Sequence, residues 1–211
     1  MKKLRKYLFL ERRKRNYFME WKDRIDEMCA YELEEQIIYS IKIGFLSNEE
    51  IQEECEEYIE NYDDVGKISS EEFLEIVMKF RKEFQNVGEQ ENFLKLDLAF
   101  KNMEKQGIVA LHEDCACGFE DCTEIAAKRY ENGEKVIGCC FYTSQDVERI
   151  LDGNRLFYFS FGNCFEEPTT EEVGQIIVEE LEKVGFVVQW NQSADTKIAI
   201  VDFVWDKKYC E

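Results

Sequence analysis

The stretch that decides the fold is Gly107-Ile-Val-Ala-Leu-His112-Glu-Asp-Cys115-Ala-Cys117-Gly118-Phe-Glu-Asp-Cys122. Its apolar run predicts a strand, the cysteine-bearing residues that follow predict a loop, and 120–131 has the apolar spacing of a helix. A helical pattern over 91–105 precedes the stretch and stops at Gly107, a residue type that often ends a helix in the left-handed conformation. The stretch therefore predicts the order helix, strand, loop, helix.

Beyond this stretch the pattern keeps alternating between strands and helices. The further predicted strands are 135–142, 155–161, 186–190 and 197–204, and the predicted helices between them are 144–151 and 170–184. Strands that alternate with helices favour a sheet with helices packed on it, while the last two strands form an antiparallel hairpin. We therefore expect a mixed sheet of about five strands flanked by helices.

The first 85 residues show helical periodicity instead. Apolar residues recur every three or four positions between Phe18 and Ile41, which is the spacing of a buried helix face. Ser47 with Glu50, and Ser69 with Glu72, have the capping-box spacing of a helix start. We expect an α+β protein with a helical N-terminal region at 1–85 and an α/β sheet domain at 86–211, either as two domains or as one compact unit.

Charge is the clearest feature of the composition. The chain of 211 residues has a formal net charge of −19, and residues 1–24 hold ten Lys or Arg against three Asp or Glu. The remaining residues therefore hold 17 basic and 43 acidic side chains. An acidic body repels nucleic-acid phosphate but suits a basic protein partner that approaches by electrostatic steering. Solubility alone is the simpler explanation of the charge.

The absence of long apolar runs indicates the expected compartment. No window approaches the roughly 20 apolar residues of a membrane-spanning helix, and the longest N-terminal apolar run, Tyr7–Leu10, is too short for a signal peptide. We therefore expect a cytoplasmic protein whose nine cysteines are reduced thiols. The basic residues of 1–15 are expected to begin a helix that lies on the acidic body, although a nucleic-acid or membrane-surface arm is an alternative.

One candidate site is a metal or thiol centre in the opening stretch. His112, Cys115, Cys117 and Cys122 offer imidazole and thiolate ligands that suit zinc, and Cys139 or Cys140 on the next strand could add another. The spacing lacks the two close pairs of common structural zinc sites. The favoured interpretation is therefore that His112 ends a strand and that the cysteines are small, partly buried residues.

A second candidate site lies at the end of the next predicted strand. Tyr142, Gln145 and Asp146 stand between a strand and the first turn of a helix, where open sheets often bind ligands. Thr143 with Asp146 also has the spacing of a helix cap, which explains much of the pattern. If a ligand or partner site exists, we expect it where His112 and 142–146 meet at neighbouring strand ends.

Several short motifs in order suggest a family. They are Gly44-Phe45, Leu96-x-x-Ala99-Phe100, Gly107-Ile108-x-Ala110-Leu111-His112, Gly138-x-Cys140-Phe141-Tyr142-x-x-Gln145-Asp146-x-Glu148-Arg149, and Gly185 with Val188-x-Trp190. From about Leu33 to Val204 the chain resembles an uncharacterised bacterial family known only as a domain of unknown function. The resemblance implies no established activity. Similar sequences tend to have histidine at the position of Thr143 and a loop rich in Thr, Ser, Asp and Gly at 115–118, and these departures weaken the metal interpretation.

These observations favour a binding protein over an enzyme. We expect a non-enzymatic acidic protein without a cofactor, of the immunity or antitoxin kind, that engages a basic bacterial toxin. One alternative is a zinc-binding or hydrolytic enzyme centred on His112, Cys115, Cys117 and Cys122. The other is a small-molecule sensor that uses the strand ends around Tyr142 and Asp146.

Overall fold

The computed structural model describes residues 21–60, 68–112 and 119–209. It divides into two compact units, residues 1–90 with 206–211 and residues 91–205. The chain therefore leaves the helical unit once, forms the sheet unit, and returns to the helical unit with its last residues, which the sequence alone had placed in the sheet domain. The basic residues 1–15 lie outside the described ranges. No helix within these ranges has both the length and the apolar character needed to cross a bilayer.

The first unit is helical, as the periodicity predicts. A 3₁₀ turn, Lys22–Arg24, precedes α2 (Glu27–Ile43), α3 (Asn48–Ile59) and α4 (Ser70–Phe84). Ser47 and Glu50 form the predicted capping box of α3, and the Ser69 hydroxyl accepts the backbone N–H of Glu72 at the start of α4. The three helices enclose one core of buried residues that includes Leu33, Ile51 and Phe73.

The last described residues complete this helical unit. α2 ends at Gly44 in the left-handed conformation (φ 73°), and a Cβ there would lie 2.9 Å from the Lys207 carbonyl oxygen, so the C-terminal segment passes directly over the glycine. The Asn86 amide donates to the carbonyls of Lys42 and Lys207. The guanidinium of Arg81 lies 5.0 Å from the centroid of the Tyr209 ring. Residues 207–209 thus fix the ends of α2 and α4.

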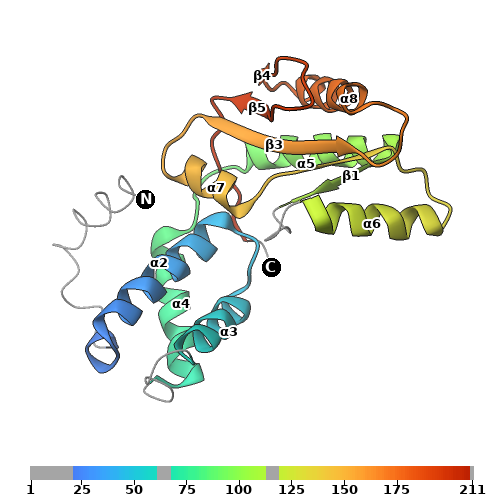
Figure 1. Cartoon of the computed structure of the whole chain (residues 1–211). Helices are drawn as coiled ribbons and strands as arrows, with labels where there is room; N and C mark the ends of the chain where they lie inside the picture. The colour runs from blue at the N-terminus through green and yellow to red at the C-terminus, as the bar shows by residue number, and fades with distance from the viewer. Residues whose placement is uncertain (1–20, 61–67, 113–118, 210–211) are drawn as a thin grey trace. The chain divides into compact units, whose positions relative to one another are not determined.

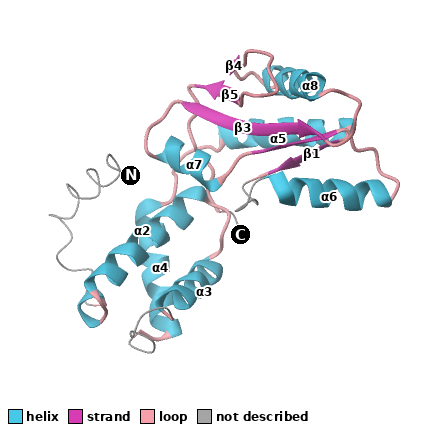
Figure 2. Ribbon diagram, in the orientation of Figure 1, coloured by secondary structure: helices cyan, strands magenta, loops and turns pink. Residues whose placement is uncertain are grey.

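The second unit is a mixed five-stranded sheet with helices on both sides, which confirms the predicted α+β class (Figures 1 and 2). Its elements are α5 (Glu91–Gln106), β1 (Ile108–Leu111), α6 (Phe119–Glu131), β2 (Gly138–Phe141), α7 (Ser144–Leu151), β3 (Leu156–Asn163), α8 (Thr170–Lys183), β4 (Val188–Gln189) and β5 (Ile198–Val201). The strand order is β1-β2-β3-β5-β4, in which β1 and β2 are parallel and the other neighbours are antiparallel.

Strand alternation gives the sheet two different faces. One face carries Phe157, Phe159 and Phe161 of β3 toward α5 and α8, and all three are buried. The other face carries Val109, Cys139 and Phe141 toward α6, with α7 packed farther along on β3. In Figure 1, α5 lies behind the sheet and α7 lies in front of it. Successive residues at a strand end therefore point to opposite faces of the sheet and pack against different helices.

Gly174 in the middle of α8 offers a test of this packing. A glycine-to-alanine change in an ordinary helix interior stabilises the protein by about 1 kcal/mol. Here the added Cβ would lie 2.6 Å from Trp190 and 2.8 Å from Phe161. We therefore expect Gly174→Ala to lower the free energy of unfolding by about 1–3 kcal/mol in urea denaturation. Gln175→Ala, at the exposed next position, should leave it nearly unchanged, and a stabilised Gly174→Ala protein would contradict the packing.

Candidate functional site

His112 and Tyr142 meet at the ends of β1 and β2. The two strands are parallel and in register, with Leu111 beside Phe141, so the residues that follow them emerge at the same edge of the sheet. Nδ1 of His112 lies 3.0 Å from the hydroxyl oxygen of Tyr142. The structure thus brings together two of the residues that the sequence places at neighbouring strand ends.

Helix α5 determines how the His112 ring is oriented. The ring of Phe100 stacks on the imidazole with centroids 4.4 Å apart and an angle of 18° between the planes. A carboxylate oxygen of Asp97, one turn earlier, lies 3.5 Å from Nε2. A carboxylate only accepts hydrogen bonds, so its position beside Nε2 favours the neutral tautomer that carries the proton on Nε2. In that tautomer Nδ1 accepts a hydrogen bond from the Tyr142 hydroxyl.

Tyr142 lies inside an aromatic cluster and is 0% exposed. Its ring contacts those of Phe100, Phe157, Phe159 and Trp205, with centroid separations between 4.8 and 6.1 Å. The hydroxyl is therefore sealed from any ligand, whereas the His112 side chain keeps 20% of its surface exposed. Asp97, His112 and Tyr142 are the residue types of a proton relay. Because the Tyr142 hydroxyl is buried, their contacts are better suited to holding the ends of β1 and β2 together than to reacting with a substrate.

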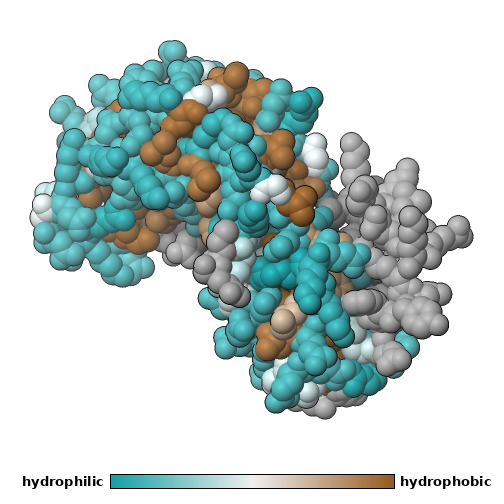
Figure 3. All heavy atoms as spheres, turned by 180° about the vertical axis from the view of Figure 1, so that it is seen from behind, coloured by the Kyte–Doolittle hydropathy of each residue, from teal (hydrophilic) through white to brown (hydrophobic). Residues whose placement is uncertain are grey.

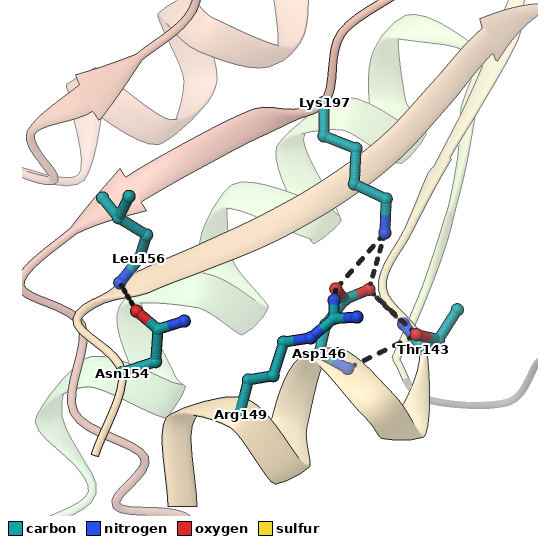
Figure 4. A network of polar contacts seen from close by, with 6 residues as sticks. All are labelled: Thr143, Asp146, Arg149, Asn154, Leu156 and Lys197. Atoms are coloured by element: carbon teal, nitrogen blue, oxygen red, sulfur yellow. Dashed lines mark hydrogen bonds and ion pairs between the residues drawn. The ribbon is translucent and has the colours of Figure 1, made fainter. Parts of the chain in front are cut away.

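Asp146 forms a separate polar site on α7 (Figure 4). Its backbone and side chain make the predicted capping box with Thr143. The carboxylate, with 0% side-chain exposure, also accepts hydrogen bonds from Lys197 at 2.9 and 3.2 Å and from Arg149 at 2.9 Å. Lys197 comes from the turn before β5 and reaches across β3 to α7. The buried charge is thereby paired with two cations, which accounts for its burial in structural terms.

The second predicted site is therefore divided between the two faces of the sheet. His112 and Tyr142 lie on the α5 face, whereas Asp146 belongs to α7 on the opposite face. Gln145 lies exposed on α7. These residues follow adjacent strands, as the sequence predicts, but they do not converge on one ligand.

The two described members of the predicted metal set are likewise held apart. His112 packs against Phe100 of α5, whereas Cys122 is buried between α6 and the other face of the sheet. Cys115 and Cys117 lie outside the described residues. Within the part of the chain that the structure describes, no three His, Cys, Asp or Glu side chains are grouped to hold a metal ion.

A cluster of three thiols lies under α6 instead. Cys122 and Cys139 are buried, and the half-buried Cys164 packs against them. The Cys139 thiol also donates to the Gly162 carbonyl at 3.7 Å. The hydrogen bond with Cys122 and the burial of the site raise the pKa of Cys139 to about 12. The hydrogen bond with Cys139, followed by burial, raises the pKa of Cys164. Cys139 and Cys164 are therefore protonated at neutral pH, the form of a thiol that does not act as a nucleophile.

The sequence alone did not single out Cys164. It lies just after β3, two residues past Gly162, which pairs with Cys139 across the strands. Only the pairing register of β2 and β3 would have shown that Cys164 lies near Cys139. Cys140, the immediate neighbour of Cys139, points to the opposite face and is also buried, and that burial raises the pKa of its thiol.

Comparison with protein families shows what kind of protein this is. Residues 26–209 match the family described as a domain of unknown function, DUF6891. The chain belongs to that family, and the matched residues include the whole stretch on which the resemblance was based. Comparison with curated proteins and with solved structures gives no match.

The hydrogen bond between His112 and Tyr142 predicts a measurable stability difference. Tyr142→Phe removes the buried hydroxyl and leaves Nδ1 of His112 without its donor, so we expect a loss of about 1 kcal/mol in the free energy of unfolding. Tyr158→Phe, on the half-buried opposite side of β3, is the matched control and should cost less. Equal effects of the two changes in urea denaturation would show that the hydrogen bond contributes nothing.

The raised thiol pKa values predict slow alkylation of the folded protein. An ordinary thiol, with a pKa of about 8.5, reacts readily with iodoacetamide at about pH 8. Cys139 becomes a thiolate only as the pH approaches its pKa of about 12, so we expect peptide mass spectrometry to find Cys139 and Cys140 unmodified in the native protein. The same peptides from unfolded protein should be fully modified. Native and unfolded labelling at the same rate would contradict the assignment.

Proposed function

We propose that this member of the DUF6891 family is a non-enzymatic binding protein, of the immunity or antitoxin kind, whose glutamate-rich helix α3 engages a basic protein. The proposal rests on the charge pattern of α3. Glu49, Glu53 and Glu57 recur every four residues and Glu60 follows three later, and all four are exposed. Residues spaced in this way lie on one side of a helix, so these four side chains form a glutamate ridge.

The ridge contrasts with the other helices of the same protein. Four of their acidic residues have a lysine one turn away, in the pairs Glu75–Lys79, Glu91–Lys95, Asp97–Lys101 and Glu124–Lys128. No Lys or Arg occurs between Asn48 and Glu60. Like charges at this spacing repel by about 0.2–0.5 kcal/mol per pair, so the spacing of the ridge carries a cost. A basic partner would relieve that repulsion on binding.

The net negative charge of the whole chain also favours a basic partner. With 46 acidic and 27 basic residues, the protein attracts a positively charged partner over a distance set by the ionic strength. Polar side chains also dominate the face shown in Figure 3, where apolar patches are small and interrupted. Such a surface favours charge-guided recognition over a broad hydrophobic contact.

The test is to neutralise the ridge and measure binding. The variant carries Glu49, Glu53, Glu57 and Glu60 each changed to Gln, which preserves the capping residue Glu50. The probes are the purified basic proteins encoded by the genes adjacent to this one, titrated by calorimetry against wild type and variant. We expect wild type to bind one of them and the ridge variant to bind at least about tenfold more weakly, because several charge pairs at the rim are lost together.

A matched variant distinguishes the effect of the glutamate ridge on binding from the effect of net charge. Glu166, Glu171, Glu179 and Glu182, which are exposed in and just before α8, are changed to Gln to alter the charge by the same amount. This control should bind within about threefold of wild type, apart from a small effect of long-range steering. If no adjacent basic protein binds, or if both variants lose the same affinity, the glutamate ridge is not the recognition surface.

A further inference from the structure

Two exposed aromatic side chains of the sheet unit lie in contact with each other. Tyr130, in the last turn of α6, is 58% exposed, and Phe165, just after β3, is 39% exposed. Their ring centroids are 4.7 Å apart, with an angle of 45° between the planes. Figure 1 shows the ends of α6 and β3 at the same margin of this unit. Two segments that are far apart in the sequence thus form one aromatic pair whose rings remain open to solvent.

Hydrogen bonds hold the backbone on both sides of the aromatic pair. Beyond Tyr130, the backbone N–H of Glu134 donates to the carbonyl of Arg129 at 3.0 Å, which closes the end of α6. The side-chain amide of Asn163 donates to the carbonyl of Phe165 at 2.6 Å. The rings are therefore carried by turns that are already formed, and preformed turns reduce the entropy that binding costs.

The aromatic pair is flanked by carboxylates. Three exposed glutamates follow the rings in the two segments, namely Glu131, Glu134 and Glu167. The carbonyl end of α6 adds the negative end of a helix dipole at Tyr130. The neighbouring cations are directed elsewhere. Lys128 pairs with a carboxylate one turn back on α6 at 2.8 Å, and Arg129 pairs with a carboxylate of α5. The stem of Lys135 lies against Gly107. This surface therefore favours a positively charged ligand.

We propose that the aromatic pair binds an arginine side chain of a basic protein. The face of a tyrosine or phenylalanine ring attracts a cation that lies within about 6 Å of its centroid. A guanidinium is planar, so it can stack on a ring while its N–H groups reach the flanking carboxylates, whereas a lysine ammonium is a compact point charge. Tyrosine, phenylalanine and arginine are also enriched in protein interfaces.

The exposure of the rings selects a protein over a small molecule. A free ligand of low molecular mass needs a concave site that encloses most of its surface, whereas Tyr130 is more than half exposed. A side chain that projects from a partner meets such an open surface and is covered by the partner itself. The proposal rests on the proposed function only in taking the partner to be a basic protein. The glutamate ridge belongs to the other unit and consists of carboxylates alone, so it attracts lysine and arginine alike.

Nuclear magnetic resonance of the full, isotope-labelled chain tests the proposal. The probe is Nα-acetyl-arginine amide, a single cation that resembles an arginine within a protein. We expect its addition to shift the backbone amide signals of Tyr130, Gly133 and Phe165 until they saturate. Nα-acetyl-lysine amide should bind at these signals at least about threefold more weakly, because a compact ammonium stacks less well on the rings. Equal affinities for the two probes would contradict recognition through the rings.

Exchange of the two rings provides the matched variants. Tyr130→Leu combined with Phe165→Leu keeps apolar side chains but removes both aromatic faces, so the arginine probe should bind at least about fivefold more weakly. Tyr130→Phe combined with Phe165→Tyr keeps both faces and should bind within about twofold of wild type. Unchanged signals in the rest of the chain show that each variant is folded.

The absence of a saturable shift, or a leucine variant that binds the probe as tightly as wild type, would overturn the proposal. So would free arginine that binds about tenfold more tightly than the blocked probe, because the site would then recognise the amino acid. Tighter binding after Arg12, Arg13 and Arg15 are each changed to Gln would show instead that this chain's own N-terminal segment occupies the surface. The signals of Glu49 and Glu53 report the glutamate ridge separately, so either surface can fail alone.

Discussion

The sheet unit depends on the hydrogen bond between Tyr142 and His112. A buried hydroxyl without a partner costs about 1–3 kcal/mol, and the Tyr142 hydroxyl is buried within a cluster of aromatic rings. His112 supplies the acceptor because its strand runs parallel to β2 and ends at the same level. Asp97 and Phe100 then hold the imidazole from α5. One bond thus couples two strand ends and a helix, and the aromatic core can close around it.

The second constraint is the close approach of α8 to the sheet. A Cβ at Gly138 would lie 2.6 Å from the Gly162 carbonyl oxygen and 2.7 Å from Val173. Gly174 makes equivalent room for Phe161 and Trp190 on the same face. The absence of two side chains therefore allows the large aromatic residues of β3 and the hairpin to interlock with the helix.

Local patterns in the sequence predicted the elements well, whereas long-range contacts escaped them. The capping boxes at Ser47 and Thr143 occur where the spacing placed them, since a cap depends on residues three apart. Lys197 pairs with Asp146 from 51 positions away, a contact that no local period encodes. The return of Lys207 to Gly44 is of the same kind. For such contacts the sequence specifies the residue types but not the register that joins them.

The candidate site was predictable to the same extent. The expectation that His112 and Tyr142 lie at neighbouring strand ends needed only the order of elements and a parallel pair. The separation of Asp146 from them, and of Cys122 from His112, needed the face to which each side chain points. A shift of one residue along a strand reverses that face, so a site built from strand ends cannot be assembled by sequence proximity alone.

The charge of the chain governs how the proposed recognition surface would act. The glutamate ridge of α3 gains from the surrounding negative field, because that field draws in a basic partner. Salt screens the field, so added salt weakens attraction at the ridge. Recognition by a lysine-free helix on an acidic protein therefore depends on ionic strength more than recognition through an apolar surface would.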